Sequence, residues 1–241
     1  MLTYFIADLH LTQERADITD CFLSFLRNEA PKAEKLYILG DFFEFWVGDD
    51  DDHPFVLNIA NELKKLSAIG TELFFIVGNR DFLIGKKYAK KCGMTLLPDV
   101  QVINLYGTKT VIMHGDSLCI DDIEYQKFRK KSRSWWWSKG IQCLPLWLRK
   151  KMARDYRAKS AMKKNDLTPE IMDVTQSEVV KELEDNDCQL MIHGHTHRPA
   201  IHQLEANGKP ATRIVLGDWY EQGAWLKFTP DGYELLSTSF K

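Results

Sequence analysis

No apolar run in this chain approaches the ~18 residues that a helix needs to cross a bilayer. No basic and apolar leader precedes the first strand-like residues, Tyr4 to Ala7, so we expect a cytosolic protein without a secretory signal. The five cysteines are odd in number and lack C-x-x-C spacing, which predicts reduced thiols and disfavours a cysteine-bound zinc site. Low-complexity tracts and internal repeats are absent as well. The 241 residues suit one α/β domain and are marginal for two, so we expect a single domain over 1–241.

Charge is nearly balanced overall but unevenly distributed. The net charge is −2, yet the segment 127–164 holds fourteen Lys or Arg and one acid, Asp155, a local charge of +13. Such a block favours contact with an anionic partner: nucleic acid, phospholipid head groups or a phosphorylated substrate.

Hydrophobic periodicity predicts an alternation of strands and helices followed by a strand-rich last third. Strands are expected at about 2–7, 35–39, 73–77, 101–105, 110–113, 189–192, 200–204, 213–216, 224–228 and 233–236. Helices are expected at about 18–28, 54–67, 82–91 and 169–184, the last with Thr168 as N-cap and Pro169 at its first position. This order predicts β-α-β units that feed a layered α/β domain closed by an antiparallel sheet.

The segment of about 120–165 interrupts this pattern and interleaves tryptophans with the basic residues. Gly140 and Pro145 are expected to break it into at least two helices. Trp135 to Trp137 cannot all face one core, because successive helical positions lie about 100° apart. One interpretation is a helical pair packed on the domain with its cations in water. The other is an amphipathic lid for an amphiphilic anionic ligand, resting on a membrane surface.

Short polar clusters follow the strand-like runs, and together they contain the residue types that bind divalent metals. The clusters are Asp8-Leu9-His10, Gly40-Asp41, Gly78-Asn79-Arg80-Asp81, His114-Gly115-Asp116 and Gly194-His195-Thr196-His197. Ligand sites in open α/β sheets gather beyond the carboxyl ends of the strands, so these clusters are expected to converge. Residues i and i+2 share one face if a strand continues, which would let Asp8 and His10 reach one ion.

Each cluster alone has a simpler explanation, since Asn, Asp and Gly dominate turns and a lone histidine is usually a loop or core residue. His53 and His202 lie outside the clusters and are interpreted as ordinary loop or core histidines. For all five clusters together, coincidence is a much poorer explanation. Carboxylate, imidazole and amide ligands suit Mn, Fe, Co, Ni or Zn. Two such ions about 3.5–4 Å apart activate water and neutralise a phosphoryl group, so phosphoryl chemistry is expected.

In order and spacing, these clusters resemble the calcineurin-like metallophosphoesterase superfamily, whose motifs are D-x-H, G-D-x-x-[DE], G-N-[HR]-[DE], H-G-D and G-H-x-H. The resemblance extends from Phe5 to Leu216 and implies a four-layer α/β/β/α sandwich, here with an inserted helical lid at about 120–165. It also implies two metal sites that share Asp41. One would be formed by Asp8, His10, Asp41 and His197, and the other by Asp41, Asn79, His114 and His195.

Arg80 occupies a position where many members of the superfamily carry histidine. Arginine stays protonated and cannot donate a proton to a leaving group, but it can fork onto phosphate oxygens. The leaving group should therefore depart without protonation. A phosphate leaving from a pyrophosphate does so, since its second pKa is about 6. Arg80 thus favours pyrophosphate cleavage over hydrolysis of a simple phosphomonoester.

Longer blocks are similar to the UDP-2,3-diacylglucosamine diphosphatase family of lipid A biosynthesis in Gram-negative bacteria. These blocks are Leu36 to Asp41, Gly78 to Leu83, His114 to Asp122, Ile171 to Val174 and His193 to Pro199. The resemblance implies hydrolysis of UDP-2,3-diacylglucosamine to 2,3-diacylglucosamine 1-phosphate (lipid X) and UMP, with two Mn²⁺ per subunit. It also implies a peripheral location at the cytoplasmic face of the inner membrane. An apolar cleft with a basic rim would suit such a lipid-linked substrate.

The same resemblance implies a set of residues that contact substrate. Asn79, Arg80 and His195 would act at the phosphate as catalytic residues, and the aligned positions near the nucleotide or the glucosamine phosphate are Asp122, Tyr125, Arg157 and Ser160. The family often has a lysine where Leu167 falls, and Lys164 is expected to replace it here. For each of these lid positions, the alternative is that the side chain lies on a solvated helix face and does not contact substrate.

Two rival functions remain open at this stage. A nuclease or broad phosphodiesterase could use the basic segment to grip nucleic acid, although Arg80 and the tryptophan-rich segment favour a lipid-linked substrate and no nucleic-acid partner. A membrane-bound scaffold without metals is the other, and the presence of every expected ligand weighs against it.

Overall fold

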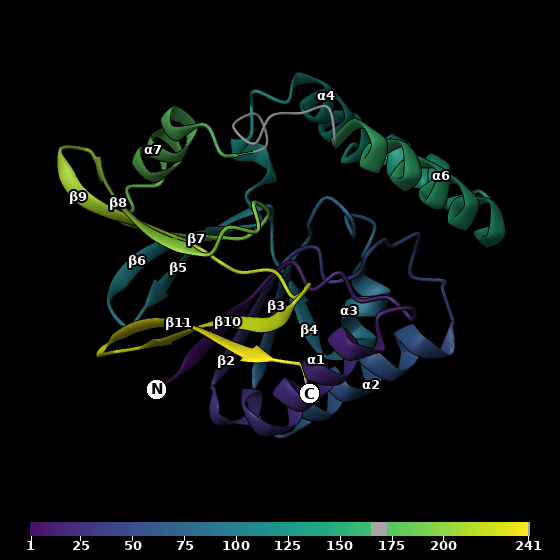
Figure 1. The fold of residues 1–241 in the computed structure, drawn as a ribbon, viewed down its shortest axis with the longest axis horizontal. Coiled ribbons are helices and arrows are strands. Elements are labelled where there is room, and N and C mark those ends of the chain that lie inside the picture. Colours follow the sequence, from purple (N-terminus) through teal and green to yellow (C-terminus); the bar gives the residue numbers. More distant parts are fainter. Residues whose placement is uncertain (165–172, 241) are drawn as a thin grey trace.

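The structure, a computed structural model, describes residues 1–164 and 173–240, and over 158–164 it describes the backbone alone. Figure 1 shows the arrangement of its elements. The helices are α1 Ala16–Asn28, α2 Pro54–Ala68, α3 Lys86–Cys92, α4 Ile123–Ser132, α5 Trp135–Gln142, α6 Leu146–Lys164 and α7 Gln176–Asp185, with short 3-10 turns η1 Ala30–Lys32 and η2 Asp116–Leu118. The strands are β1 Thr3–Ile6, β2 Lys35–Leu39, β3 Glu72–Ile76, β4 Met94–Leu96, β5 Val100–Leu105, β6 Thr108–Met113, β7 Leu190–His193, β8 Ala200–Ala206, β9 Lys209–Val215, β10 Gln222–Thr229 and β11 Gly232–Ser239.

These strands form two sheets. The first has the order β11-β10-β1-β2-β3-β4, in which β1 to β4 run parallel and β10 and β11 add an antiparallel edge. The second has the order β5-β6-β7-β9-β8, with β6, β7 and β9 parallel and an antiparallel strand at each edge. The carboxyl ends of β1, β2 and β3 therefore share one edge, as do those of β6, β7 and β9.

Alternating side chains divide the core into three layers. Tyr4 and Ile6 of β1 pack with α1, α2 and α3 on one face of the first sheet. Phe5 points the other way, into the apolar layer between the two sheets, where its ring stacks on Tyr37 at 4.9 Å. Val179 and Leu183 of α7 cover the outer face of the second sheet. The result is the expected α/β/β/α sandwich, with α1 and α2 below the sheets and α7 above them in Figure 1.

The ten strands expected from the sequence are all present within a few residues, but one further strand was not expected and two helices begin later than predicted. β4 is missed, because three residues are too few for a period-2 pattern to register. The helix expected from 82 begins only at Lys86. Asp49 sets that start, since its carboxylate accepts hydrogen bonds from the backbone N–H groups of Gly85, Lys87 and Tyr88 at 2.9, 3.0 and 3.1 Å.

The helix expected over 169–184 is shorter than its pattern suggests. α7 begins at Gln176, directly after Thr175, whose backbone N–H donates to Leu118 O at 2.9 Å. Thr168 and Pro169 lie outside the described residues.

The basic segment forms three helices, α4, α5 and α6, in agreement with the expectation of at least two. Pro145 directly precedes α6, as expected, whereas Gly140 lies inside α5 and does not break it. In Figure 1, α4 and α6 lie above the carboxyl-end side of the first sheet, away from α1 and α2. None of the helices in the described part of the chain is long and apolar enough to cross a membrane.

Candidate metal centre

The seven expected ligands come from loops that directly follow β1, β2, β3, β6 and β7, and the fold brings them together. They are Asp8, His10, Asp41, Asn79, His114, His195 and His197. Their side chains form two groups with Asp41 between them.

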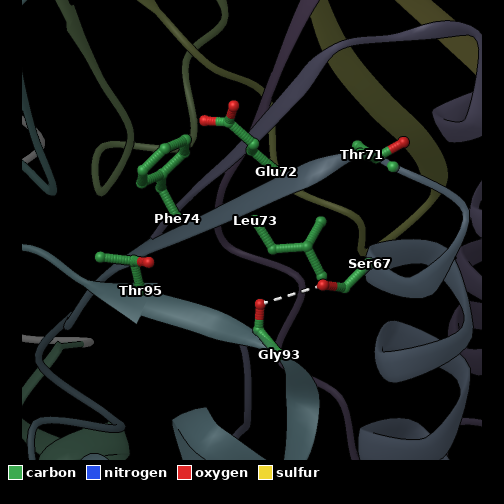
Figure 2. Close-up of a pocket in the computed structure, with 8 residues that line it drawn as sticks. Ser67, Thr71, Glu72, Leu73, Phe74, Gly93 and Thr95 are labelled. Carbon is green, nitrogen blue, oxygen red and sulfur yellow. Dashed lines mark hydrogen bonds between the residues drawn. The ribbon is translucent and has the colours of Figure 1, made fainter.

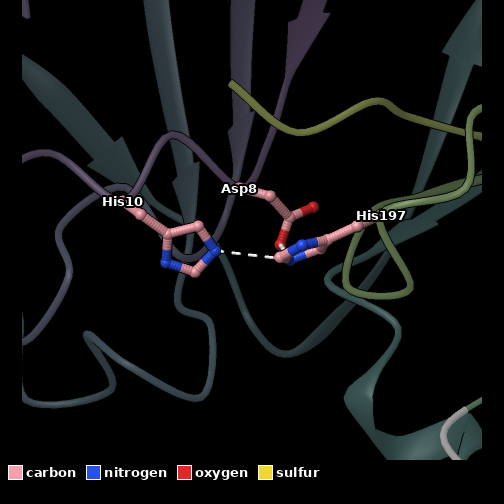
Figure 3. Close-up of side chains that lie close together, drawn as sticks. All are labelled: Asp8, His10 and His197. Atoms are coloured by element: carbon pink, nitrogen blue, oxygen red, sulfur yellow. Dashed lines mark hydrogen bonds and ion pairs between the residues drawn. The ribbon is translucent and has the colours of Figure 1, made fainter. Parts of the chain in front are cut away.

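The first group joins the β1 loop to the β7 loop. Nε2 of His197 lies 3.3 Å from Nε2 of His10 and 3.4 Å from Oδ1 of Asp8. Figure 3 shows the three side chains converging on one point. One potential ligand atom from each lies within 4.8 Å of the others, a spacing that one metal ion can satisfy.

The second group joins loops of both sheets. Oδ1 of Asn79 lies 3.0 Å from Nε2 of His114 and 3.0 Å from Nδ1 of His195, and these two nitrogens are 3.2 Å apart. Two imidazoles and an amide oxygen thus surround a second point.

Asp41 faces both groups with different oxygens. Its Oδ2 lies 3.9 Å from Nε2 of His10, and its Oδ1 lies 3.6 Å from Nε2 of His114. Asp8, Asp41 and His114 also have ligand atoms within 4.8 Å of one another. This is the arrangement in which one carboxylate can bridge two ions.

The loops reach this geometry through a strained backbone rather than through continuing strands. β1 ends at Ile6 and β7 at His193, so the face-sharing argument for i and i+2 does not apply. Left-handed φ values between 50° and 72° occur instead at Asp8, His10, Asp41, His195 and His197. Non-glycine residues rarely adopt this region, and such strain concentrates at functional sites.

The outward nitrogens of three imidazoles each face an acceptor. Nδ1 of His114 donates to Leu39 O at 2.8 Å, Nδ1 of His10 faces Glu44 Oε2 at 3.1 Å, and Nδ1 of His197 faces Asp218 Oδ2 at 3.4 Å. Metal-binding histidines are oriented in this way, with the other nitrogen directed at the ion. Oδ1 of Asp8 is buried and has no hydrogen-bond partner in the part of the chain that the structure describes, so the donor set fits a divalent cation.

Burial makes two of the histidines poor bases. It lowers the pKa of His10 to about 4, although Asp41 and Asp8 oppose the shift. Burial and the neighbouring His114 lower the pKa of His195 to about 3. Burial also acts on His114, but there the carboxylates of Asp41 and Asp8 dominate and raise its pKa. At neutral pH, His10 and His195 therefore carry free lone pairs for a metal.

Arg80 lies at the rim of the centre. Its backbone N–H donates to Asp41 Oδ1 at 2.8 Å, and its Nε lies 3.9 Å from Asp41 Oδ2. The guanidinium is thus adjacent to the shared carboxylate and retains partial access to solvent.

The expected substrate-contact residues divide into three groups. Tyr125 and Arg157 approach the centre: the Tyr125 ring lies 6.3 Å from that of His195, and Arg157 pairs with Glu44. Asp122 instead caps α4, accepting from the Tyr125 backbone N–H at 2.9 Å. Ser160 and Lys164 belong to α6, and their side chains lie outside the described part of the structure.

Asp116 is an anchoring residue to which the sequence assigned no role. It is buried and accepts hydrogen bonds from Arg129 Nε at 2.8 Å, Arg133 Nη2 at 3.2 Å and the Tyr125 hydroxyl. Its place in the H-G-D cluster was the available signal. Because two of its partners belong to α4, it connects that helix to the loop that carries His114.

Asp218 and Tyr220 had no signal in the sequence. Tyr220 stacks on His10 with ring centroids 5.1 Å apart and planes inclined by 6°. Both residues lie between β9 and β10, outside every motif; they lie at the centre because β9 pairs with β7 and β10 pairs with β1.

The tryptophans of the basic segment are divided between core and solvent. Trp135 and Trp136 are 75 % and 57 % exposed, as is Trp147 at 68 %. Trp137 packs against Phe82 and Phe128, with ring centroids 5.9 and 6.3 Å away. Some of the three consecutive rings therefore remain uncovered, as the sequence predicted.

A shallow hollow of about 320 Å³ lies elsewhere, at the amino-terminal end of β3 (Figure 2). Ser67, Thr71, Glu72 and Phe74 line it, together with Thr95. It contains none of the residues expected to act, so the chemistry is assigned to the loops at the opposite ends of the strands.

Comparison with known proteins agrees with this geometry. The calcineurin-like phosphoesterase family profile matches residues 1–199. Proteins named UDP-2,3-diacylglucosamine hydrolase are 54 % identical in Vibrio parahaemolyticus (100 % of this chain and 99 % of that protein) and 54 % identical in Marinobacter nauticus (94 % and 93 %). An archaeal phosphodiesterase structure aligns over 98 % of this chain and 99 % of its own with a TM-score of 0.52 and 14 % identity, a similarity of fold alone. On this evidence the chain belongs to the calcineurin-like phosphoesterase family.

Proposed function

We propose that this protein hydrolyses the pyrophosphate bond of UDP-2,3-diacylglucosamine to give lipid X and UMP, a step of lipid A biosynthesis. Relatives that carry this name cover the whole chain at about half identity. The observation that carries the chemistry is the position of Asp41, between two imidazole groups and beside Arg80.

Two Mn²⁺ ions per subunit are proposed for the centre. Asp8, His10 and His197 would hold one and Asn79, His114 and His195 the other, with Asp41 shared. Bound there, two divalent ions supply an activated water and neutralise charge on the phosphoryl group. The strained loops and the acceptors behind the imidazoles support this assignment, because they fix the ligands before a cation arrives.

Arg80 is proposed to bind the phosphoryl oxygens and to stabilise charge that develops on them. Its guanidinium remains protonated, so it acts by hydrogen bonding and not by proton transfer. Asn79 and His195 are proposed to meet the same phosphate. Because the pKa of His195 is near 3, this imidazole is neutral and does not protonate the leaving group at neutral pH. A lipid-linked phosphate leaves without a proton, which fits this set of residues.

The three helices of the basic segment are proposed to form a lid that receives the acyl chains and rests on the cytoplasmic face of the inner membrane. The exposed rings of Trp135, Trp136 and Trp147 provide apolar surface near many cations. Such a surface suits an amphiphilic anion. Arg149 of α6 fixes this segment to the domain, donating to Val47 O at 2.6 Å and pairing with Asp50.

Turnover of UDP-2,3-diacylglucosamine in ¹⁸O-labelled water tests the proposal. Attack on the α-phosphorus places one labelled oxygen in UMP and leaves lipid X unlabelled. Label in lipid X alone would contradict the proposed direction of attack, and absence of both products would contradict the function.

A further inference from the structure

Arg213 of β9 is a buried cation that the metal centre does not use. Its side chain belongs to the outer face of the second sheet, since Ala211 packs in the layer under α7 while Ile214 faces the opposite layer. Arg213 is only 6 % exposed, and its Nε and Nη1 have no hydrogen-bond partner among the described residues.

This burial is costly unless an anion compensates it. A guanidinium is not deprotonated in proteins, and a buried unpaired charge loses its hydration without return. Burial accordingly lowers the pKa of Arg213, although Asp173 and Cys119 oppose the shift. The unused donors therefore indicate a ligand with negative charge.

The Arg213 side chain lines a cavity of about 180 Å³ whose other polar groups are mostly donors. Thr196, Arg198, His202 and Asp173 contribute to its wall. Asp173 is the one carboxylate among the described lining residues, and both its oxygens are engaged. Oδ1 accepts from the Val174 backbone N–H at 2.7 Å, and Oδ2 accepts from Arg198 at 3.0 Å.

We propose that this cavity is a second anion site, separate from the metal centre, that binds a phosphate group. The fork of Arg213 would hold two of its oxygens, and Arg198 and the Thr196 hydroxyl would meet it from other sides. Donors from several directions suit a tetrahedral dianion better than a planar carboxylate. Thr196 lies between His195 and His197, so a bound phosphate links the loop of these expected ligands to β9.

Thermal unfolding of the metal-loaded protein with inorganic phosphate tests this inference. At about 100 times its dissociation constant, phosphate should raise the Tm of the wild type by about 5–10 °C. Arg213→Met should lose most of that shift, whereas Arg27→Met, which removes an exposed arginine of α1, should keep it. An unchanged shift in Arg213→Met would overturn the site, because binding would then occur wholly elsewhere, for instance at the metal centre.

The Tm of the same variants in the absence of phosphate is a second test. Removing an unpaired buried charge should leave the Tm of Arg213→Met in phosphate-free buffer equal to or above that of the wild type. A lower Tm would assign Arg213 a structural partner and overturn the inference. Arg213→Lys is the second variant: it keeps the charge but loses the fork, so its affinity for phosphate should fall about tenfold, and an unchanged affinity would overturn the site.

Titration with UMP distinguishes the source of the phosphate. If inorganic phosphate and UMP both raise the Tm, and Arg213→Met loses both increases, the site accepts any phosphomonoester group. If only the Tm increase caused by inorganic phosphate depends on Arg213, the site is restricted to the free ion.

Discussion

The carboxylate of Asp41 lies between His10 and His114 and presents a different oxygen to each imidazole, at 3.9 and 3.6 Å. The two histidines belong to loops of different sheets, after β1 and β6. Asp41 therefore faces both halves of the centre, and its backbone φ of 50° shows that the chain is strained to place it there.

Replacing Asp41 with Ala should remove metal from both halves of the centre and reduce turnover to near background. The physical reason is that both ions lose a ligand and the mutual repulsion of their charges is no longer offset. Metal content per subunit, measured by mass spectrometry alongside turnover, checks this. Asp17→Ala, which removes an exposed carboxylate of α1, is the control. Retention of one full equivalent of metal would refute the bridging role.

Arg80→Ala should lower kcat by about 10²–10³ while metal content stays nearly unchanged. In comparable sites, loss of one hydrogen-bond donor to the charge that develops in the transition state lowers kcat by this factor. Metal content should stay because Arg80 is not expected to bind metal. Arg80→Lys should recover only part of the rate, because an ammonium cannot form the two parallel bonds of a guanidinium. A loss of metal equal to the loss of rate would instead give Arg80 a structural role.

The convergence of the expected ligands was predictable from the sequence, because each follows a strand-like run and strands of this kind end at a common edge. Their geometry was not. Asp8-x-His10 suggested a continuing strand, yet both residues have left-handed φ, which their spacing does not encode. Alternating strands and helices predicted a layered α/β domain, and the resemblance to the metallophosphoesterase superfamily implied its α/β/β/α order.

Contacts between residues distant in sequence account for what the sequence could not predict. Asp49 caps α3 from a loop more than thirty residues earlier, and so moves the helix start past Gly85. Asp218 and Tyr220 reach His197 and His10 through the pairing of β9 with β7 and of β10 with β1. No local pattern marks such residues, because their roles arise from tertiary structure alone.

Substitution of both Trp135 and Trp136 by Ala should raise KM for the diacyl substrate about tenfold and leave hydrolysis of a soluble aryl phosphodiester unchanged. Two exposed rings that cover acyl chains contribute on the order of 1–2 kcal/mol, and 1.4 kcal/mol corresponds to a factor of ten. Tm should not fall, since both rings are mostly exposed.

Trp137→Ala is the matched variant. It should lower Tm, because this ring packs on Phe82 and Phe128. Equal effects of the Trp135 and Trp136 substitutions on both substrates would remove the lid from the proposal.

Stability of the metal-free protein should fall as the pH decreases from about 6.5 to about 4. His10 and His193 have pKa values lowered to about 4, chiefly by burial, and burial and His114 lower that of His195 to about 3. In this window the unfolded chain binds more protons than the folded one, so the free energy of unfolding rises with pH, by up to about 1.4 kcal/mol per pH unit for each histidine. His114, whose pKa is raised, acts in the opposite sense. Urea unfolding at pH 4.5, 5.5 and 6.5 measures the net slope. His193→Asn, at a position outside the expected ligands, should reduce it by about one proton, and a slope unchanged by that substitution would show that His193 does not titrate in this range.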